Sequence, residues 1–444
     1  MQLKTTLTGF LIALATLANA TDLNVPADYA TIQDAVNAAA SGDTIHIAPG
    51  VYVAQTWISN KNLTLIGQPG TILRAFPGML AAIPGEIEWR CVLYIYQSSN
   101  VVVRDLTFEG DQLADQNVYG LVGAQFDLSG GSVENCRFTG FRERTPGSVS
   151  GHAIAFWNDY SGAPLFQAEV IGNIIEDSYT GIQIGGAPDT TSFNFLVADN
   201  TITGVGPNTA NDGMVGISLL EGAVGTVARN TISGFSYIGD GSNRGGLRAF
   251  GILALSSDFP GNVVPLEPMT FERNVLRNNQ VQFGLILGDD SVVTNNTFEG
   301  TALGANPAGL WFSGSNVQVV GNQFRDMPGG ILLAGLGAAV GNAANAMLID
   351  NRFCDVTTPI NQQPQATATE QGTSLCPFPN PVLDIASAVL VCWPEVEEGF
   401  SVETAPTMDG PWTPSESSHF LENGSQCVAV PTSSDQQFFR LVKP

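Results

Sequence analysis

The stretch Val319-Val-Gly-Asn-Gln-Phe324 decides the fold of this chain, because its pattern returns along the middle of the sequence. A branched or aromatic hydrophobe stands three residues before a fixed position, here called the slot, and another large hydrophobe stands two residues after it. Two copies place leucine or cysteine in the slot, Val103/Leu106/Phe108 and Val133/Cys136/Phe138. Seven copies place asparagine there: Val170/Asn173/Ile175, Val197/Asn200/Ile202, Val227/Asn230/Ile232, Phe271/Asn274/Leu276, Val293/Asn296/Phe298, Val319/Asn322/Phe324 and Leu348/Asn351/Phe353. Successive slots lie 30, 37, 27, 30, 44, 22, 26 and 29 residues apart, which is typical of stacked repeats.

Side-chain parity indicates what one copy builds. In a strand, residues two apart share a face, so the slot and the hydrophobe after it point the same way. The hydrophobe before the slot has the opposite parity, and both reach one core only if the chain bends between them. Each copy is therefore predicted to be two short strands meeting at a corner. The inward asparagines are predicted to form a hydrogen-bonded ladder, because a buried amide needs partners.

Most copies continue into a third strand that begins with glycine and a hydrophobe: Gly181-Ile182, Gly216-Ile217, Gly251-Ile252, Gly284-Leu285, Gly309-Leu310 and Gly330-Ile331. Three short strands in a coil of at least 22 residues resemble the right-handed parallel β-helix of the pectin-lyase-like superfamily, over about residues 24–360. The resemblance implies an all-β fold of about ten coils. Within that superfamily the fold alone decides function poorly.

The sequence before the repeats agrees with this fold. Residues 28–40 space Ile32, Val36 and Ala39 along one helical face. Strand-like segments at 42–52 and 63–67 follow. This order resembles the helix that plugs the N-terminal end of such β-helices in pectin methylesterases, where it covers the core and the open strand edges.

Composition divides the chain into four parts. Residues 1–20 are predicted to be a secretion signal, since Lys4 and an apolar run precede Ala18-Asn-Ala20. Residues 21–356 are assigned to the β-helix, 357–381 to a proline-rich linker, and 382–444 to a small β-sandwich. The last part resembles modules at the C-termini of secreted proteins of environmental bacteria. No later stretch is long enough to cross a membrane, so we expect a secreted or cell-surface bacterial protein.

Cysteines and charge narrow the partners. Six cysteines in an exported chain predict disulfides, and we assign Cys354 to Cys376 and Cys392 to Cys427, whereas Cys91 and Cys136 are expected not to pair. The chain has 17 Lys+Arg against 41 Asp+Glu, a net charge of −24. This field disfavours nucleic acid and anionic membranes, and also a polyanionic sugar unless Ca²⁺ or local arginines compensate.

The sequence predicts no transition-metal site. Its three histidines are scattered and no paired cysteine motif is present, so a copper-loading role is poorly supported. Calcium at Asp289-Asp290 is one possibility, but a turn is the default for that pair.

In the families that this fold resembles, ligands lie along the outer face of the glycine-initiated strands. Two interpretations of the later, apolar part of that face stay open: burial under a loop or the C-terminal domain, and a sugar-stacking platform centred on Trp311. Parity predicts one outward residue in each coil, in the order Asp127, Ala155, Gln183, Ser218, Leu253, Ile286, Trp311 and Leu332.

Three insertions precede these strands and are expected to overhang one edge of the groove. They gather Arg142, Arg144, Arg244 and Arg248 with His152, in a chain that has few cations. The arginines either serve a site or form ordinary salt bridges, such as one between Arg142 and Asp159.

A lyase is the first mechanism that fits these residue types. It needs a base for the proton next to a uronate carboxylate, and cations that neutralise that carboxylate. His152 or Tyr160 is the candidate base. The candidate neutralisers are Arg144, Arg244 and Arg248.

A glycoside hydrolase is the second mechanism. It needs two carboxylates about 5–10 Å apart, and Asp127 with Asp212 or Asp240 is the most plausible set. The motifs of known β-helix enzymes do not transfer. Gly151-His152-Ala precedes Asp289-Asp290, the reverse of the order in polygalacturonases, and the mature chain keeps only Lys61 and Lys443 as lysines.

We expect an exported protein that engages an extracellular polysaccharide along this groove, as a lyase or hydrolase, with Arg142, Tyr160, Gln183, Arg244 and Trp311 contacting the substrate. The alternative is a non-catalytic cell-surface or adhesion scaffold with a C-terminal tether. A scaffold predicts that the loop residues scatter or form ion pairs. An enzyme predicts that six residues converge within about 10 Å: Asp127, Arg144, His152, Asp212, Asp240 and Arg248.

Overall fold

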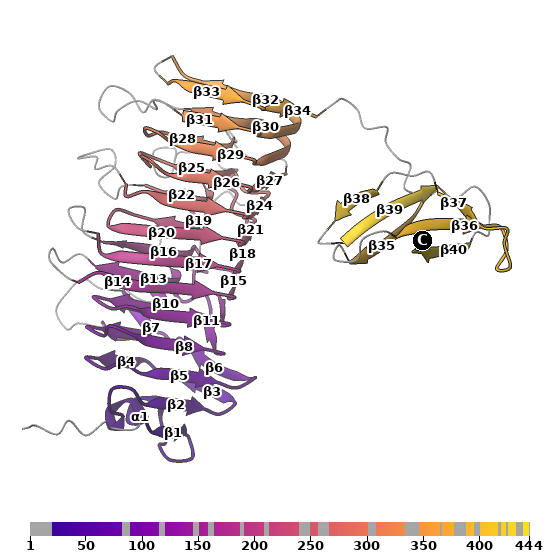
Figure 1. The fold of residues 1–444 in the computed structure, drawn as a ribbon. Coiled ribbons are helices and arrows are strands. Elements are labelled where there is room, and N and C mark those ends of the chain that lie inside the picture. Colours follow the sequence, from indigo (N-terminus) through magenta and orange to yellow (C-terminus); the bar gives the residue numbers. More distant parts are fainter. Residues whose placement is uncertain are drawn as a thin grey trace, which may run out of the picture. The chain divides into compact units, whose positions relative to one another are not determined.

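The fold was examined in a computed structural model (Figure 1). Two compact units divide the chain, Met1–Cys376 and Pro377–Pro444, and each is described by itself. No described helix is long and apolar enough to cross a membrane. The structure describes residues 20–81, 89–114, 120–144, 151–158, 164–186, 191–207, 213–238, 249–255, 266–300, 308–333, 346–364, 366–376, 388–394, 400–415, 419–422, 425–431 and 438–443.

Unit 1 is a right-handed parallel β-helix, which confirms the predicted fold class. Its first sheet has 13 parallel strands: β1 (Asp22–Val25), β2 (Thr44–Ile47), β5 (Thr64–Gly67), β8 (Val101–Arg104), β11 (Gly131–Glu134), β14 (Phe166–Ile171), β17 (Phe193–Ala198), β20 (Ala223–Ala228), β23 (Met269–Glu272), β26 (Val292–Thr294), β29 (Gln318–Val320), β31 (Ala346–Ile349) and β33 (Ala368–Gln371). The sequence predicts about ten coils, fewer than these 13 strands, because coils at both ends lack the asparagine that marks the repeat.

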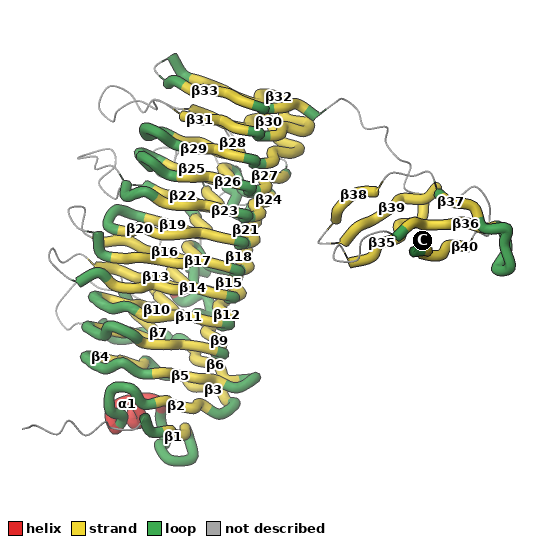
Figure 2. The backbone as a smooth tube through the Cα atoms, viewed as in Figure 1, coloured by secondary structure: helices red, strands yellow, loops and turns green. Residues whose placement is uncertain are grey.

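The other strands of unit 1 form two further ladders (Figure 2). The short ladder follows the slot: β3 (Gly50–Val53), β6 (Thr71–Arg74), β9 (Thr107–Glu109), β12 (Arg137–Thr139), β15 (Ile174–Glu176), β18 (Thr201–Thr203), β21 (Thr231–Ser233), β24 (Val275–Arg277), β27 (Thr297–Glu299), β30 (Gln323–Leu333), β32 (Arg352–Gln362) and β34 (Ser374–Leu375). The long ladder follows the glycines and continues into the second halves of β30 and β32: β4 (Thr56–Ser59), β7 (Arg90–Tyr96), β10 (Leu121–Asp127), β13 (His152–Asn158), β16 (Thr180–Gly186), β19 (Val215–Leu219), β22 (Phe250–Ala254), β25 (Val281–Leu285) and β28 (Ala308–Phe312).

The corner between the first sheet and the short ladder is built as the parity predicts. The residue before each of the nine slots has a positive φ, as in Asn135 (51°) and Asp199 (59°), and this left-handed residue turns the chain inward. Each of the seven slot asparagines donates from Nδ2 to a backbone carbonyl of the preceding coil, and six also donate to the Oδ1 of the next asparagine, at 2.9–3.1 Å. The predicted ladder is therefore confirmed, from Asn173 to Asn351.

The ladder begins at Cys136, whose backbone N–H donates to Asn173 Oδ1 at 2.9 Å. Its thiol is buried and contacts the carbonyl oxygens of Val103 and Glu134. Burial raises the pKa of the Cys136 thiol to about 12, because the thiolate would lose its hydration. Neither Cys136 nor Cys91 is in a disulfide, as expected, and Cys136 acts as a small buried hydrophobe.

The glycines of the long ladder stand where the chain turns from an outward to an inward residue, and no side chain fits there. A Cβ on Gly216 would lie 2.5 Å from the carbonyl oxygen of Gly251 and 2.7 Å from the Ile232 side chain. The next coil approaches so closely that only glycine, or a shifted backbone, is accommodated.

We predict that Gly216→Val lowers the free energy of unfolding by about 1–3 kcal/mol, because the added atoms overpack the coil contact. The measurement is the urea midpoint of the purified protein, compared with Ser218→Val two residues further along the same strand. The side chain of Ser218 lies on the outer face, so that variant should change stability by less than about 0.5 kcal/mol. Equal losses in both variants would show that the glycine is not required for the close contact.

Helix α1 (Ile32–Ala38) packs against β1, β2 and β4 and buries Ile32, Ala35 and Val36. The Thr31 hydroxyl accepts the backbone N–H of Asp34 and caps the helix. At the other end, Lys61 Nζ donates to the carbonyl oxygens of Val36 and Ala39, both at 2.8 Å. The plug predicted for the first coil is therefore present, and Lys61 satisfies its last carbonyl groups.

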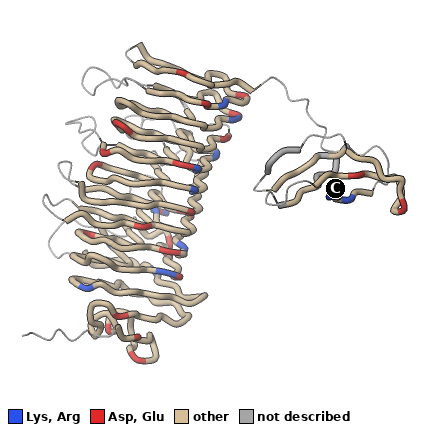
Figure 3. The backbone as a smooth tube through the Cα atoms, in the orientation of Figure 1, with Lys and Arg blue, Asp and Glu red and all other residues tan. Residues whose placement is uncertain are grey.

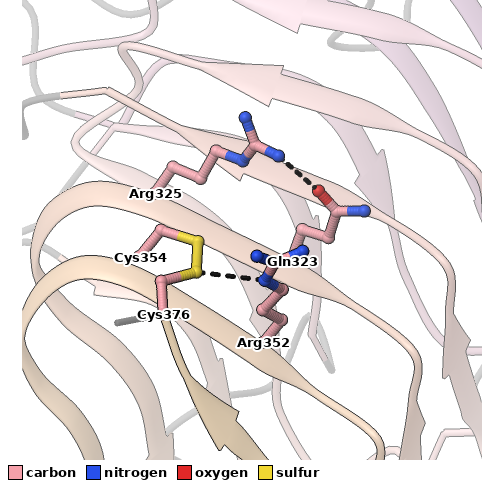
Figure 4. The surroundings of a disulfide bond; sticks show 5 residues. All are labelled: Gln323, Arg325, Arg352, Cys354 and Cys376. Atoms are coloured by element: carbon pink, nitrogen blue, oxygen red, sulfur yellow. Dashed lines mark hydrogen bonds between the residues drawn. A yellow bond between two sulfur atoms is a disulfide. The ribbon is translucent and has the colours of Figure 1, made fainter. Parts of the chain in front are cut away.

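The β-helix ends later than the sequence suggests. β32, β33 and β34 occupy residues 352–375, whereas residues 357–381 are predicted to be a linker. The prediction missed this last coil because the polar segment 357–375 does not repeat the slot pattern. The predicted disulfide between Cys354 and Cys376 closes this coil, and Arg352 Nε lies 3.1 Å from the Cys376 sulfur (Figure 4).

Unit 2 consists of two antiparallel sheets of three strands each. β35 (Ala388–Pro394), β38 (His419–Glu422) and β39 (Ser425–Pro431) form one sheet, and β36 (Ser401–Ala405), β37 (Thr413–Pro414) and β40 (Phe438–Val442) form the other. Trp393 and Val428 from the first sheet share one small core with Val402 from the second. The predicted disulfide between Cys392 and Cys427 joins β35 to β39.

Candidate functional site

The outer face of the long ladder carries three rows of side chains that cross successive coils. The first row consists of Cys91, Val122, His152, Thr180, Val215, Phe250, Val281 and Ala308. The middle row consists of Trp57, Tyr94, Gln125, Ala155, Gln183, Ser218, Leu253, Gly284, Trp311 and Leu332. The third row consists of Ser59, Tyr96, Asp127, Trp157 and Gly185.

The register corrects the predicted stripe at two coils. Asp127 and Ile286 were each placed in the middle row, but the register puts Gln125 and Gly284 there. In β25 the corner position opposite Gly251 is occupied by Gln282, not by a glycine. Asn279 donates to Gln282 Oε1 at 2.7 Å and so holds the larger side chain in place. Gly284 stands two residues after this corner position and was taken for the corner glycine. The predicted outward residue of this coil was therefore placed two residues too far along the chain, at Ile286.

A cluster of aromatic and polar groups surrounds Asp127 in the N-terminal half of this face. Tyr94 Oη donates to Asp127 Oδ2 at 2.5 Å. The rings of Tyr94 and Tyr96 are stacked, with centroids 6.1 Å apart. The register places Asp127 between Tyr96 and Trp157, both of which are half-buried. We call Tyr94, Tyr96, Asp127 and Trp157 the aromatic–carboxylate cluster.

His152 lies at the opposite edge of the same face and is only 8% exposed. Its ring contacts Trp89 edge-on, with centroids 4.5 Å apart, and its Nδ1 has no hydrogen-bond partner among the described residues. Burial lowers the pKa of His152 to about 4, because the imidazolium would lose its hydration, so the ring is neutral near pH 7. His152 is aligned with Val122, and Asp127 follows Val122 by five residues on the same strand. Five residues of strand span up to about 16 Å. His152 and Asp127 share a face without forming a pair.

The two described arginines of the insertions form ion pairs. Arg142 Nε bonds to Asp177 Oδ1, and Arg142 Nη1 donates to the Glu143 carbonyl oxygen at 2.9 Å. Arg144 lies 3.6 Å from an Asp111 carboxylate oxygen. The salt-bridge interpretation therefore holds for both, although the partner of Arg142 is Asp177 and not the suggested Asp159.

The C-terminal half of the face is apolar. Phe250 and Trp311 are stacked with centroids 6.3 Å apart, and Val215 and Val281 pack beside them. Trp311 also contacts a second cluster that contains Ile286. Neighbours on the same face thus bury part of Trp311, whereas burial under a loop or the C-terminal domain stays a prediction.

Five predicted site residues lie outside the described part of the chain: Tyr160, Asp212, Asp240, Arg244 and Arg248. The described residues hold no group of three or more His, Cys, Asp or Glu side chains suited to a metal ion. Asp289 and Asp290 form a turn, as the default assignment has it. Asp289 Oδ1 accepts the Ser315 backbone N–H at 2.7 Å, and Asp290 Oδ1 accepts Asn316 Nδ2 at 3.1 Å.

Sequence reasoning missed Trp89, Tyr94, Tyr96 and Trp157. Tyr94 and Tyr96 alternate with Leu93 and Ile95, and this alternation already places them on the outer face. The predicted stripe begins at Asp127, one coil after Tyr94 and Tyr96, and it takes Ala155 and not Trp157 from β13.

The sequence profile of a family described as "Right handed beta helix region" matches residues 123–324. Among solved structures, the catalytic domain of a GH87 α-1,3-glucanase in complex with tetrasaccharides is 14% identical, with a TM-score of 0.49 and coverage of 81% of this chain and 70% of that one. A periplasmic alginate epimerase is 11% identical, with a TM-score of 0.46 and coverage of 75% and 77%. A polygalacturonase from Erwinia carotovora ssp. carotovora is 9% identical, with a TM-score of 0.36 and coverage of 80% and 96%. A search of curated proteins found no match. Over residues 123–324, the chain is thus similar to the right-handed β-helix family, and its coils have that architecture.

Proposed function

We propose that this protein is exported and binds an extracellular polysaccharide along the outer face of the long ladder. The observation that carries the proposal is the aromatic–carboxylate cluster, in which Tyr96, Asp127 and Trp157 stand side by side on three successive coils. Aromatic rings offer a flat apolar surface, and the hydroxyl groups of a sugar need hydrogen-bond acceptors beside it. The cluster supplies both.

The length of the face suits a polymer. The part of the middle row that is polar, aromatic or small runs over six coils, from Trp57 on β4 to Ser218 on β19. Five steps between neighbouring strands amount to about 24 Å. A chain of several sugar units laid parallel to the helix axis would meet the cluster and then Gln183.

Binding is better supported than catalysis by the described residues. Asp127 is the one carboxylate in the three outward rows, and a hydrolase needs two. Arg142 and Arg144, candidates for binding or neutralising the substrate, are already in ion pairs. These observations favour the non-catalytic alternative, in which the groove binds without cleaving. A hydrolase would need its second carboxylate from Asp212 or Asp240.

The disulfides support the proposed compartment. Cys354–Cys376 and Cys392–Cys427 are structural bridges, which persist in oxidising compartments. Together with the predicted signal at residues 1–20, they support export to the cell surface or the medium.

We predict that Trp157→Ala weakens polysaccharide binding by roughly 30-fold, the loss of about 2 kcal/mol expected for an aromatic anchor. The measurement is calorimetric titration of the purified protein against a panel of neutral and acidic polysaccharides, while reducing ends and absorbance near 235 nm report cleavage. Ile174→Ala, an exposed apolar change on β15 of the short ladder, is the matched control and should bind normally.

Four outcomes separate the alternatives. Binding without cleavage that depends on Trp157 supports the proposal as stated. Reducing ends that vanish in Asp127→Ala would make the protein a hydrolase, and unsaturated product that vanishes in His152→Ala would make it a lyase. If no member of the panel binds, or if Trp157→Ala binds as tightly as the Ile174→Ala control, the groove is not the site.

A further inference from the structure

We infer that the ligand of the groove is a neutral glycan, recognised through its hydroxyl groups and apolar ring faces, and not a polyuronate; this inference rests on the proposed function. The distribution of charge on and around the outer face carries it. Three observations contribute. The outward rows contain no lysine or arginine, the described arginines of the insertions are in ion pairs, and Asp127 stands between two aromatic side chains.

The outward rows hold no cation. Among the described residues of the three rows, none is lysine or arginine, and the single ionisable acid is Asp127. Arg90, the first residue of β7, is aligned with Leu121, which faces the main core, and so stands outside these rows. A polyuronate carries one carboxylate on every sugar, and the three rows offer no cationic side chain to pair with it. Desolvating an unpaired carboxylate is costly, whereas a neutral sugar meets only amides, hydroxyls and rings.

The two described arginines of the insertions, Arg142 and Arg144, already have ion-pair partners. Arg142 is held by Asp177, whose other carboxylate oxygen also accepts Gln112 Nε2 at 2.9 Å. Arg144 faces Asp111. If either arginine bound a uronate carboxylate instead, Asp177 or Asp111 would lose its ion-pair partner. Figure 3 shows basic residues along the edge of the β-helix where the short ladder runs. On that ladder, Arg137 of β12 pairs with Glu176 of β15, and Arg277 of β24 pairs with Glu299 of β27.

The histidine on this face is uncharged near pH 7. Burial lowers the pKa of His152 to about 4, and its neighbours in register, Val122 and Thr180, carry no charge. Its ring therefore supplies no positive charge to an acidic sugar at neutral pH. The unpartnered Nδ1 can exchange a hydrogen bond with a hydroxyl group or a water molecule.

Asp127 itself selects against acidic sugars. Its carboxylate accepts from Tyr94 and stands between two aromatic side chains, so a ring stacked on Tyr96 or Trp157 brings hydroxyl groups within its reach. The same charge repels a uronate carboxylate across a few ångströms of partly desolvated space. The net charge of −24 adds a repulsive long-range field.

The test compares neutral hexose polymers with polymers that carry a carboxylate at C6. The purified full chain is titrated with mannan and polymannuronate, and with soluble glucan and galactan against polyglucuronate and polygalacturonate, at low and high salt. We expect at least one neutral polymer to bind ten times more tightly than its carboxylated counterpart, with little dependence on salt. Asp127→Asn keeps the shape and removes the charge, so it should weaken neutral binding about tenfold and narrow the ratio between the two polymers.

The matched control is Glu370→Gln on β33, which removes the same charge from an exposed strand outside the three rows and should leave the ratio unchanged. Tighter binding of a uronate polymer would overturn the inference but would still support the proposed function. If Arg244→Ala or Arg248→Ala then abolished the binding of that polymer, the replaced arginine would be one that binds its carboxylates. An unchanged ratio in Asp127→Asn would also overturn it. Absence of binding to every polymer would overturn the proposed function and the inference together.

Discussion

Replacing Asn230 by alanine is expected to lower the free energy of unfolding by about 2–6 kcal/mol, because two buried backbone groups lose their partners at about 1–3 kcal/mol each. Asn230 Nδ2 donates to the Val197 carbonyl oxygen at 2.9 Å, and its Oδ1 accepts the Asn200 backbone N–H at 3.0 Å. Both groups lie in the interior, where water cannot replace the amide. The loss should spread to neighbouring coils, since each asparagine holds the next.

The measurement is the urea midpoint together with the rate of limited proteolysis, which reports local opening of the coils. Asn194→Ala is the matched control. Its exposed amide, on the first sheet one coil away, donates only to Gln167, at 3.2 Å, so the change should cost less than about 0.5 kcal/mol. If both variants unfold at the same urea concentration, an asparagine of the ladder contributes no more to the free energy of unfolding than an ordinary surface amide does.

Acidification should destabilise the protein through His152. Burial lowers the pKa of this residue from 6.5 to about 4, so the unfolded chain binds the proton first as the pH falls. The contribution of His152 to stability is complete above about pH 6.5, is lost progressively between 6.5 and 4, and levels off below 4. A shift of this size corresponds to about 3 kcal/mol.

Acid unfolding also involves carboxylates, so the informative quantity is the difference between variants. His152→Phe keeps an aromatic ring beside Trp89 and removes the titrating group, so its stability should depend less on pH between 6.5 and 4 by about 3 kcal/mol. His46→Gln removes an exposed histidine that lies 3.1 Å from Asp22, and it should follow the original protein. Identical pH profiles for the His152→Phe variant and the original protein would mean that the imidazole is not buried in solution.

These stability predictions bear on function because the same packing creates the outer face. The corners at the slot and at the glycines set the register, and the register brings Tyr96, Asp127 and Trp157 onto neighbouring coils. The face then divides into a polar and aromatic half and an apolar half, with Ser218 and Leu253 at the boundary. The proposed binding of a neutral glycan concerns the first half. In the second half, Phe250 and Trp311 pack on each other.

Much of the fold was predictable from local sequence, because the residues of each repeat determine the conformation of their own coil. A residue with positive φ before every slot, an asparagine in the slot and two inward hydrophobes around it form a pattern that spans only six residues, as at Val197–Ile202. Both disulfides and the capping helix could also be predicted from short segments. The last coil could not, since residues 357–375 form strands by pairing with earlier coils and not by their own pattern.

The sequence by itself determined the stacked β-helix, the asparagine ladder and the acidic character of the chain, because these depend on parity, period and composition. Only the tertiary structure decided which residues meet on the outer face. Asp127 and Tyr94 lie 33 residues apart and bond to each other because β7 and β10 align in one register, and the sequence alone placed Asp127 one row away. Arg142 could pair with any nearby acid, and the corner that follows β15 brings it to Asp177. The sequence of one repeat is enough to predict the strands of its own coil. Which residues of successive coils are aligned is harder to predict, because insertions of variable length separate the strands. This alignment decides which side chains become neighbours.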